Sequence, residues 1–146
     1  MARGASNSLV NDLRSELNKA AKENIAYDLH GENPTDVKTW ISTGSTLLDY
    51  IVSNRRDGGI PVGKLTTIAG ESASGKSLVV TQILANCQKM GGLAVYIDTE
   101  NAASPDFMEQ LGLDTKNNFM YVQPGTIEEV FENIERLIGL IREKAP

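Results

Sequence analysis

The 146-residue sequence contains a single cysteine, Cys87, and a single histidine, His30. One cysteine cannot form a disulfide within the chain, and such sparse use is typical of a reducing compartment. Cys87 falls in a predicted helix, where a free thiol acts as a small apolar side chain. His30 lies in a stretch rich in Gly, Asn and Pro without neighbouring metal ligands, so the sequence predicts a surface histidine and no zinc site.

Long apolar runs are also missing. No segment approaches the roughly 20 apolar residues of a membrane-spanning helix. The opening residues MARGASNSLVND lack the apolar core of a signal peptide. These absences predict a cytoplasmic protein with no membrane partner. The net charge of −5 argues against a surface that holds nucleic acid by charge alone, although an acidic body can still carry a basic loop.

What is present predicts a globular chain in two parts. Apolar residues make up 40% and charged residues 23%, as in ordinary folded domains. Apolar side chains with helical spacing predict a helix over residues 6–24, followed by a linker at 28–36 with turn chemistry. We therefore expect a helix and linker over residues 1–36 and a separate core over 37–146. The helical stripe comprises Leu9, Val10, Leu13, Leu17 and Ala20.

The core opens with short elements. Residues 37–43 predict a short strand or extended arm, and residues 43–53 predict a short helix capped by Ser45 or Thr43. Glycines and a proline predict a loop over 55–65.

From residue 64, predicted strands and helices alternate, which indicates βαβ units and a parallel sheet. The strands are expected at 64–70, 91–100 and 117–124, and the helices at 75–90, 104–113 and 126–144. An unbroken apolar run, Leu93 to Ile97, predicts a strand buried on both faces. Ser104 before Pro105, and Thr126 three residues before Glu129, are typical helix starts.

The stretch GESASGKS joins the first of these strands to the first helix and matches the P-loop pattern in full. Backbone N–H groups of such a loop and the positive end of the helix dipole bind phosphate. Lys76 reaches the outer phosphates, and the Ser77 hydroxyl is a ligand for Mg²⁺. The candidate nucleotide-binding residues are Gly70, Glu71, Ser72, Ala73, Ser74, Gly75, Lys76 and Ser77.

A carboxylate follows the second predicted strand. Ligands of open parallel sheets bind at the carboxyl ends of the strands, where Glu100 is expected. Glu100 in that place would orient or deprotonate a water that attacks a terminal phosphate. A helix cap or an ion pair is the structural alternative for Glu100, and the role of neighbouring Asp98 stays open.

Three segments together resemble the ATPase core of RecA-type recombinases, and resemble the phage UvsX-like branch especially. They are GGIPVGKLTTIAGESASGKS, VYIDTENAASPDFMEQLGLD and NFMYVQPGTIEEVFENIERLI. The resemblance runs from about Gly58 to the end of the chain, and extends back through WISTGSTLLDYIVS. It implies a P-loop NTPase fold, an α/β parallel sheet flanked by helices, with ATP and Mg²⁺ as cofactors. It also implies filaments on single-stranded DNA.

The resemblance assigns further roles by position. Glu100 and Lys76 are implied as the catalytic pair. Phe107 falls where the family usually stacks a tyrosine on adenine, and Ser104 falls where an aspartate often contacts the adenine amino group. The helix over residues 6–24 resembles the family's subunit-packing arm, with packing on its own domain as the alternative.

The sequence departs from the family in what it lacks. The Mg²⁺-linked aspartate of the next strand (Walker B) and the two DNA-binding loops do not occur, which predicts a truncated core with an apolar edge. Other interpretations therefore stay open: a fragment that binds nucleotide or other subunits without hydrolysis, or part of another RecA-fold motor such as a hexameric helicase. A small-molecule kinase fits less well.

Overall fold

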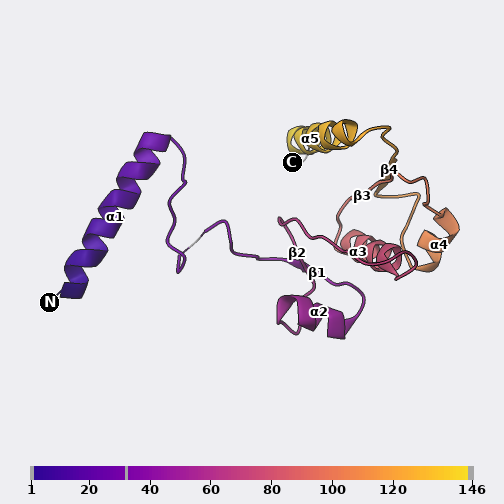
Figure 1. Cartoon of the computed structure of the whole chain (residues 1–146), viewed down its shortest axis with the longest axis horizontal. Coiled ribbons are helices and arrows are strands. Elements are labelled where there is room, and N and C mark those ends of the chain that lie inside the picture. Colours follow the sequence, from indigo (N-terminus) through magenta and orange to yellow (C-terminus); the bar gives the residue numbers. More distant parts are fainter. Residues whose placement is uncertain (1, 32, 145–146) are drawn as a thin grey trace. The chain divides into compact units, whose positions relative to one another are not determined.

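The computed structural model describes residues 2–31 and 33–144. Residue 32 of the predicted linker, and residues 1, 145 and 146, lie outside the described residues. The chain forms two compact units, residues 1–38 and 39–146, and each is described by itself (Figure 1).

The first unit is a helix with a chain segment folded back on its end. Helix α1 spans Ala2–Ala21 and begins earlier than the sequence predicted. The Asn18 side chain accepts hydrogen bonds from the backbone N–H groups of Ile25 and Ala26, at 3.0 and 2.8 Å, and donates to the Ala26 carbonyl. Since one side chain satisfies three backbone groups, it fixes how the chain leaves the helix. The apolar side chains of α1 are exposed, namely Leu9, Val10, Leu13 and Leu17.

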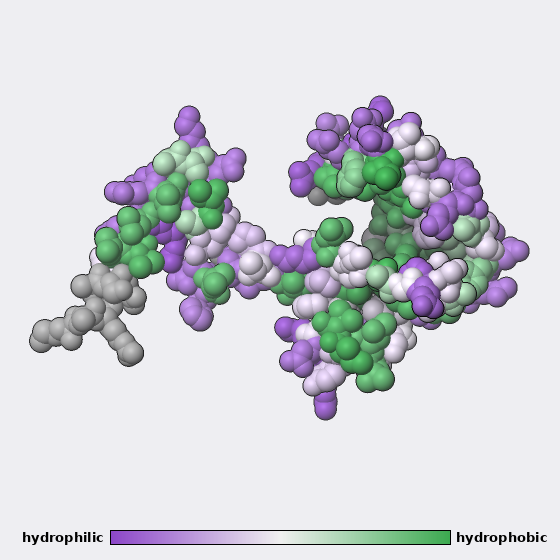
Figure 2. All heavy atoms as spheres, viewed as in Figure 1, coloured by the Kyte–Doolittle hydropathy of each residue, from purple (hydrophilic) through white to green (hydrophobic). Residues whose placement is uncertain are grey.

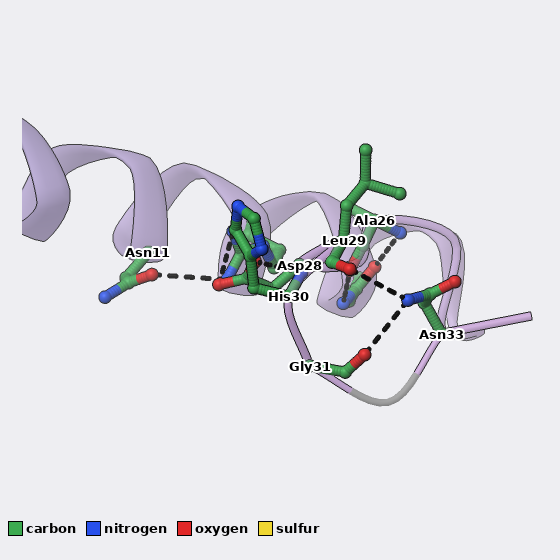
Figure 3. A network of polar contacts seen from close by, with 9 residues as sticks. Asn11, Ala26, Asp28, Leu29, His30, Gly31 and Asn33 are labelled. Carbon is green, nitrogen blue, oxygen red and sulfur yellow. Dashed lines mark hydrogen bonds and ion pairs between the residues drawn. The ribbon is translucent and has the colours of Figure 1, made fainter. Parts of the chain in front are cut away.

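The predicted linker forms a tight turn that Asn33 holds (Figure 3). The Asn33 amide donates to the carbonyl oxygens of Leu29 and Gly31. Asp28 accepts from the backbone N–H of His30 at 3.0 Å and forms an ion pair with Arg14 at 3.8 Å. His30 is exposed, as the sequence predicted.

The second unit opens with a two-stranded antiparallel sheet. Strand β1, Trp40–Ile41, pairs with β2, Ile60–Pro61. The prediction of a loop across all of residues 55–65 was therefore wrong, because β2 pairs with residues that lie 19 and 21 positions earlier in the sequence. The close approach requires Gly59, which has φ +128°, and whose added Cβ would lie 2.2 Å from the Ile41 carbonyl oxygen.

Helix α2, Thr46–Ser53, lies between these two strands in the sequence. The buried carboxylate of Asp49 fixes the start of the helix. Ser45 is the N-cap, one of the two residues predicted for that role. Asp49 is 6% exposed and accepts from the Ser42 and Thr43 hydroxyls at 2.6 Å and from the Thr43 N–H at 2.7 Å. Burial alone would raise the pKa of Asp49, but these hydrogen bonds outweigh burial and hold the pKa below its ordinary value of 3.8.

The rest of the unit alternates helices and strands. In order, the elements are α3 (Lys76–Lys89), β3 (Ala94–Ile97), α4 (Pro105–Gln110), β4 (Phe119–Val122) and α5 (Ile127–Lys144). β3 and β4 are parallel, with Tyr96 opposite Tyr121. Helix α3 packs on β3, and the small buried core consists of Ala85, Ala94, Met108 and Leu113. The predicted α/β class and the parallel pairing are thus confirmed for these elements.

The strand predicted at 64–70 does not form. Residues 64–69 make no ladder with any strand in the described part of the chain, and Leu65 is 98% exposed. The β-branched composition of this segment favours extended backbone, but a strand also needs a hydrogen-bonding neighbour. The described residues therefore do not build a P-loop parallel sheet around this segment.

Much apolar surface stays uncovered in this unit. Leu47 and Ile51 of α2 belong to an apolar patch that Figure 2 shows over that helix. No α5 side chain is buried, and Ile127 and Phe131 are among the most exposed. The prediction that Leu93 to Ile97 is buried throughout was wrong: within that run only Ala94 is buried, because the sheet has two strands.

We expect Asp49→Asn to lower the free energy of unfolding by about 1–3 kcal/mol, because the amide leaves donors of Ser42 or Thr43 unpaired. The folded pKa of Asp49 lies below 3.8, so its contribution is present above that pH and is lost as the pH falls through the folded pKa. Urea unfolding at neutral pH and at about pH 3 measures both effects; the difference between wild type and variant should shrink in acid. The exposed Asp57→Asn is the control and should change stability by less than about 0.5 kcal/mol.

Candidate functional site

One cavity brings together five of the site residues named from the sequence. It has a volume of about 470 Å³. Lys76 and Ser77 line it from the start of α3, Glu100 and Ser104 from the segment between β3 and α4, and Phe107 from α4 itself. Residues far apart in the sequence thus line the same cavity. They do so because α3 packs on β3, and the carboxyl end of β3 lies beside the start of α3.

The remaining loop residues do not line that cavity. Residues 70–74 are exposed and Gly75 is half-buried. Gly75, at φ +91°, turns the chain into α3, and Ala73 holds a positive φ of 62°. Two left-handed residues so close together curl the loop tightly, and the Ser74 N–H donates to the Glu71 carbonyl within it at 3.3 Å.

The Lys76 ammonium lies across its own loop. Its Nζ donates to the carbonyl oxygens of Gly70 at 2.9 Å and Glu71 at 2.8 Å. These bonds hold a cation at the mouth of the loop, beside the positive end of the α3 dipole. An anion bound there would find both an ammonium and a helix N-terminus.

The start of helix α4 forms another part of the cavity wall. Ser104 is the N-cap: its Oγ accepts from the Phe107 N–H at 3.4 Å, and Pro105 takes the first helical position, as predicted. The Phe107 ring is 39% exposed and lines the cavity. The Glu100 side chain is exposed at the cavity wall.

Asp98, whose role the sequence left open, is a buried carboxylate in this wall. Asp98 accepts from the backbone N–H groups of Glu100 and Ala103, both at 3.0 Å, and from the Tyr121 hydroxyl at 3.1 Å. Burial by itself would raise the pKa of Asp98, but these hydrogen bonds hold it below its ordinary value. The available signal was an aspartate directly after an apolar strand; its partner Tyr121, 23 residues away, gave no sequence signal.

Two tyrosines, Tyr96 and Tyr121, lie beside Asp98. The rings of Tyr96 and Tyr121 are stacked, with centroids 6.3 Å apart. Burial first, and then the hydrogen bond to Asp98 and its charge, raise the pKa of Tyr121. Both phenols therefore stay neutral at physiological pH, and the Tyr121 hydroxyl remains a donor.

The side chains suit a phosphorylated ligand with a flat ring. A cation, a hydroxyl and a helix N-terminus lie at one side of the cavity, and an aromatic ring lies at the other. No group of three or more His, Cys, Asp or Glu side chains that could hold a metal occurs among residues 2–31 and 33–144. A Mg²⁺ ion that accompanies ligand phosphates commonly takes one hydroxyl ligand from the protein, and Ser77 is the hydroxyl beside Lys76 in the cavity lining.

Fold and site define an α/β protein with a glycine-rich loop at the start of a helix. Residues 9–141 match the family described as RecA N-terminal domain, and the chain belongs to that family. Within its described residues, no helix has the length and apolar character needed to cross a membrane.

Three relatives called Protein RecA illustrate the similarity. That of Wolinella succinogenes is 38% identical over 107 residues, 73% of this chain and 29% of the relative. That of Acinetobacter baumannii is 34% identical over 124 residues, 85% and 34% respectively. That of Symbiobacterium thermophilum is 40% identical over 98 residues, 67% and 27%. The match thus spans about a third or less of each relative's length.

We expect Gly75→Ala to destabilise the chain by about 1 kcal/mol, because alanine is strained at positive φ. Nothing lies within 4 Å of the added Cβ, so backbone strain is the whole cost. Gly63→Ala is the matched control, with φ +78° and equally open space. Urea unfolding should give similar losses for both variants, and an unchanged Gly75→Ala would contradict the left-handed turn into α3.

Proposed function

We propose that this chain is the ATP-binding part of a DNA-dependent ATPase recombinase that forms filaments on single-stranded DNA. One observation carries the proposal: Lys76 and Ser77 line the same cavity as Glu100, although the two groups lie more than 20 residues apart. A helix cap or ion pair would not require Glu100 to face the phosphate-binding lysine.

Each side chain has a role in the proposed site. The loop of residues 70–75 and the start of α3 bind the phosphates through backbone N–H groups, and Lys76 neutralises the outer ones. The Ser77 hydroxyl would hold a Mg²⁺ ion, which would supply positive charge to offset the phosphates. Phe107 stacks on the base, and the Ser104 hydroxyl lies near the base edge. Glu100 orients and deprotonates the attacking water.

Family membership supports the proposed partners. In a RecA-type protein, filament formation needs contact between subunits, and the uncovered side chains of α1 suit such a contact. Single-stranded DNA is the proposed polymer on which such a filament forms. A cytoplasmic location fits this function.

Lys76→Ala should weaken Mg-ATP binding at least tenfold, on the order of 1.4 kcal/mol or more, since it removes the cation at the phosphate end of the site. Lys89→Ala is the matched control, because Lys89 ends the same helix and donates to Asn86 on the surface. Isothermal calorimetry on the 146-residue chain measures both. Equal affinities for the two variants would remove the basis for this nucleotide site.

Glu100→Gln should leave Mg-ATP affinity within about threefold and lower any ATP turnover about a hundredfold or more, because the amide cannot accept the water's proton. Phosphate release with and without single-stranded DNA measures turnover, and Glu109→Gln, outside the cavity lining, is the control. ATP binding through Lys76 without turnover would favour a nucleotide-binding module over an enzyme. Turnover that survives Glu100→Gln would contradict the role of Glu100.

A further inference from the structure

The buried Asp98 carboxylate organises the segment that faces Lys76. Asp98 is 6% exposed and directly follows β3. Its two oxygens have different partners. Oδ1 accepts from the Glu100 N–H, and Oδ2 accepts from the Ala103 N–H and the Tyr121 hydroxyl. The carboxylate therefore links the backbone of Glu100 to the backbone of Ala103 from the buried side of the segment.

That segment has no regular structure of its own. Residues 98–103 belong to neither a helix nor a strand, and Asn101 has a left-handed φ of 57°. Hydrogen bonds that a helix or strand would supply come instead from one side chain. Loss of the Asp98 acceptor would free the backbone at Glu100 and at Ala103, immediately before the Ser104 cap of α4.

Tyr121 adds a contact across the sheet. The β3–β4 register sets Tyr121 opposite Tyr96, and the two rings stack. The Tyr121 hydroxyl then reaches Asp98 Oδ2 at 3.1 Å. The orientation of the carboxylate is thus tied to β4, while Tyr96 itself lines the cavity.

We propose that Asp98 is the positioning residue of the nucleotide site: it holds residues 99–103 so that Glu100, Ser104 and Phe107 face the ligand, and Tyr121 orients its carboxylate. This inference rests on the proposed function. Asp98 acts through the backbone of its neighbours and need not touch the nucleotide.

A second aspartate in the same unit provides a control with the same number of hydrogen bonds. Asp114 also accepts three hydrogen bonds next to a turn, from the N–H groups of Lys116 and Asn117 and from the Asn117 amide, at 2.8 to 3.0 Å. It does not line the cavity around Lys76. Asp114 is exposed whereas Asp98 is buried, so the amide responses below, and not the Kd alone, separate a loss of positioning from a loss of stability.

The experiment compares wild type, Asp98→Asn, Tyr121→Phe and Asp114→Asn in the 146-residue chain. We expect Asp98→Asn to raise the Kd for Mg-ATP about tenfold, because its amide group opposes the Ala103 N–H and leaves that donor unpaired. Tyr121→Phe keeps both backbone bonds and should raise Kd about twofold to threefold. Asp114→Asn should stay within about twofold of wild type.

Backbone amide NMR separates positioning from loss of folding. At saturating Mg-ATP, the amides of Lys76 and Ser77 should shift in all four proteins. Those of Glu100 and Ala103 should shift with wild type and Asp114→Asn but lose most of their response in Asp98→Asn. If Asp98→Asn fails to fold, the smaller effect of Tyr121→Phe on Kd and on the same two amides decides.

The possible results lead to different conclusions. If wild type binds Mg-ATP and Asp98→Asn binds equally well with unchanged amide responses, the positioning role is wrong and the proposed function stands. Equal losses in Asp98→Asn and Asp114→Asn would also overturn the positioning role, as general destabilisation would explain both. If wild type shows no response at Lys76 and Ser77, the proposed function fails, and this inference fails with it.

Discussion

The parallel pairing of β3 with β4 is the constraint on which the site depends. Its register sets Ile97 opposite Val122, and the Asp98 N–H donates to the Val122 carbonyl at 2.9 Å. Both strands therefore end together, and the chain after β3 leaves the sheet at one defined point. Because α3 packs on β3, that point lies beside Lys76. A shift of register by one residue would turn Tyr121 away from Asp98.

Two buried carboxylates, Asp49 and Asp98, do similar structural work with neutral partners. Each is 6% exposed, and each accepts three hydrogen bonds from hydroxyl and backbone N–H groups. Such donors stabilise the ionised form without adding a cation. Asp49 sets the turn between β1 and α2, and Asp98 sets the segment between β3 and α4.

The sequence predicted the features that depend on neighbouring residues better than those that depend on contacts with distant segments. Local signals were sufficient for the helices: the apolar spacing, the Ser45 and Ser104 caps and Pro105 all lie within a few residues of the helix they start. The Thr126 cap is confirmed, because the Thr126 hydroxyl accepts a hydrogen bond from the Glu129 N–H at 3.2 Å. The Glu129 side chain in turn accepts from the Gly125 N–H. The segment at 64–70 reads as a strand in sequence yet forms none, because strand formation depends on a neighbour that composition does not specify.

The sequence by itself determined which residues are the candidates for the chemistry: the order of Gly70, Gly75, Lys76 and Ser77 ahead of a helix, and Glu100 after an apolar strand. Spacing along the chain suffices there, because a loop and the helix that it starts are continuous. Only the tertiary structure decided that Lys76 and Glu100 line one cavity, and that Tyr121 reaches Asp98. Those contacts depend on how α3 packs and on the register between β3 and β4. Both are set by burial and hydrogen bonding between segments that the sequence keeps apart.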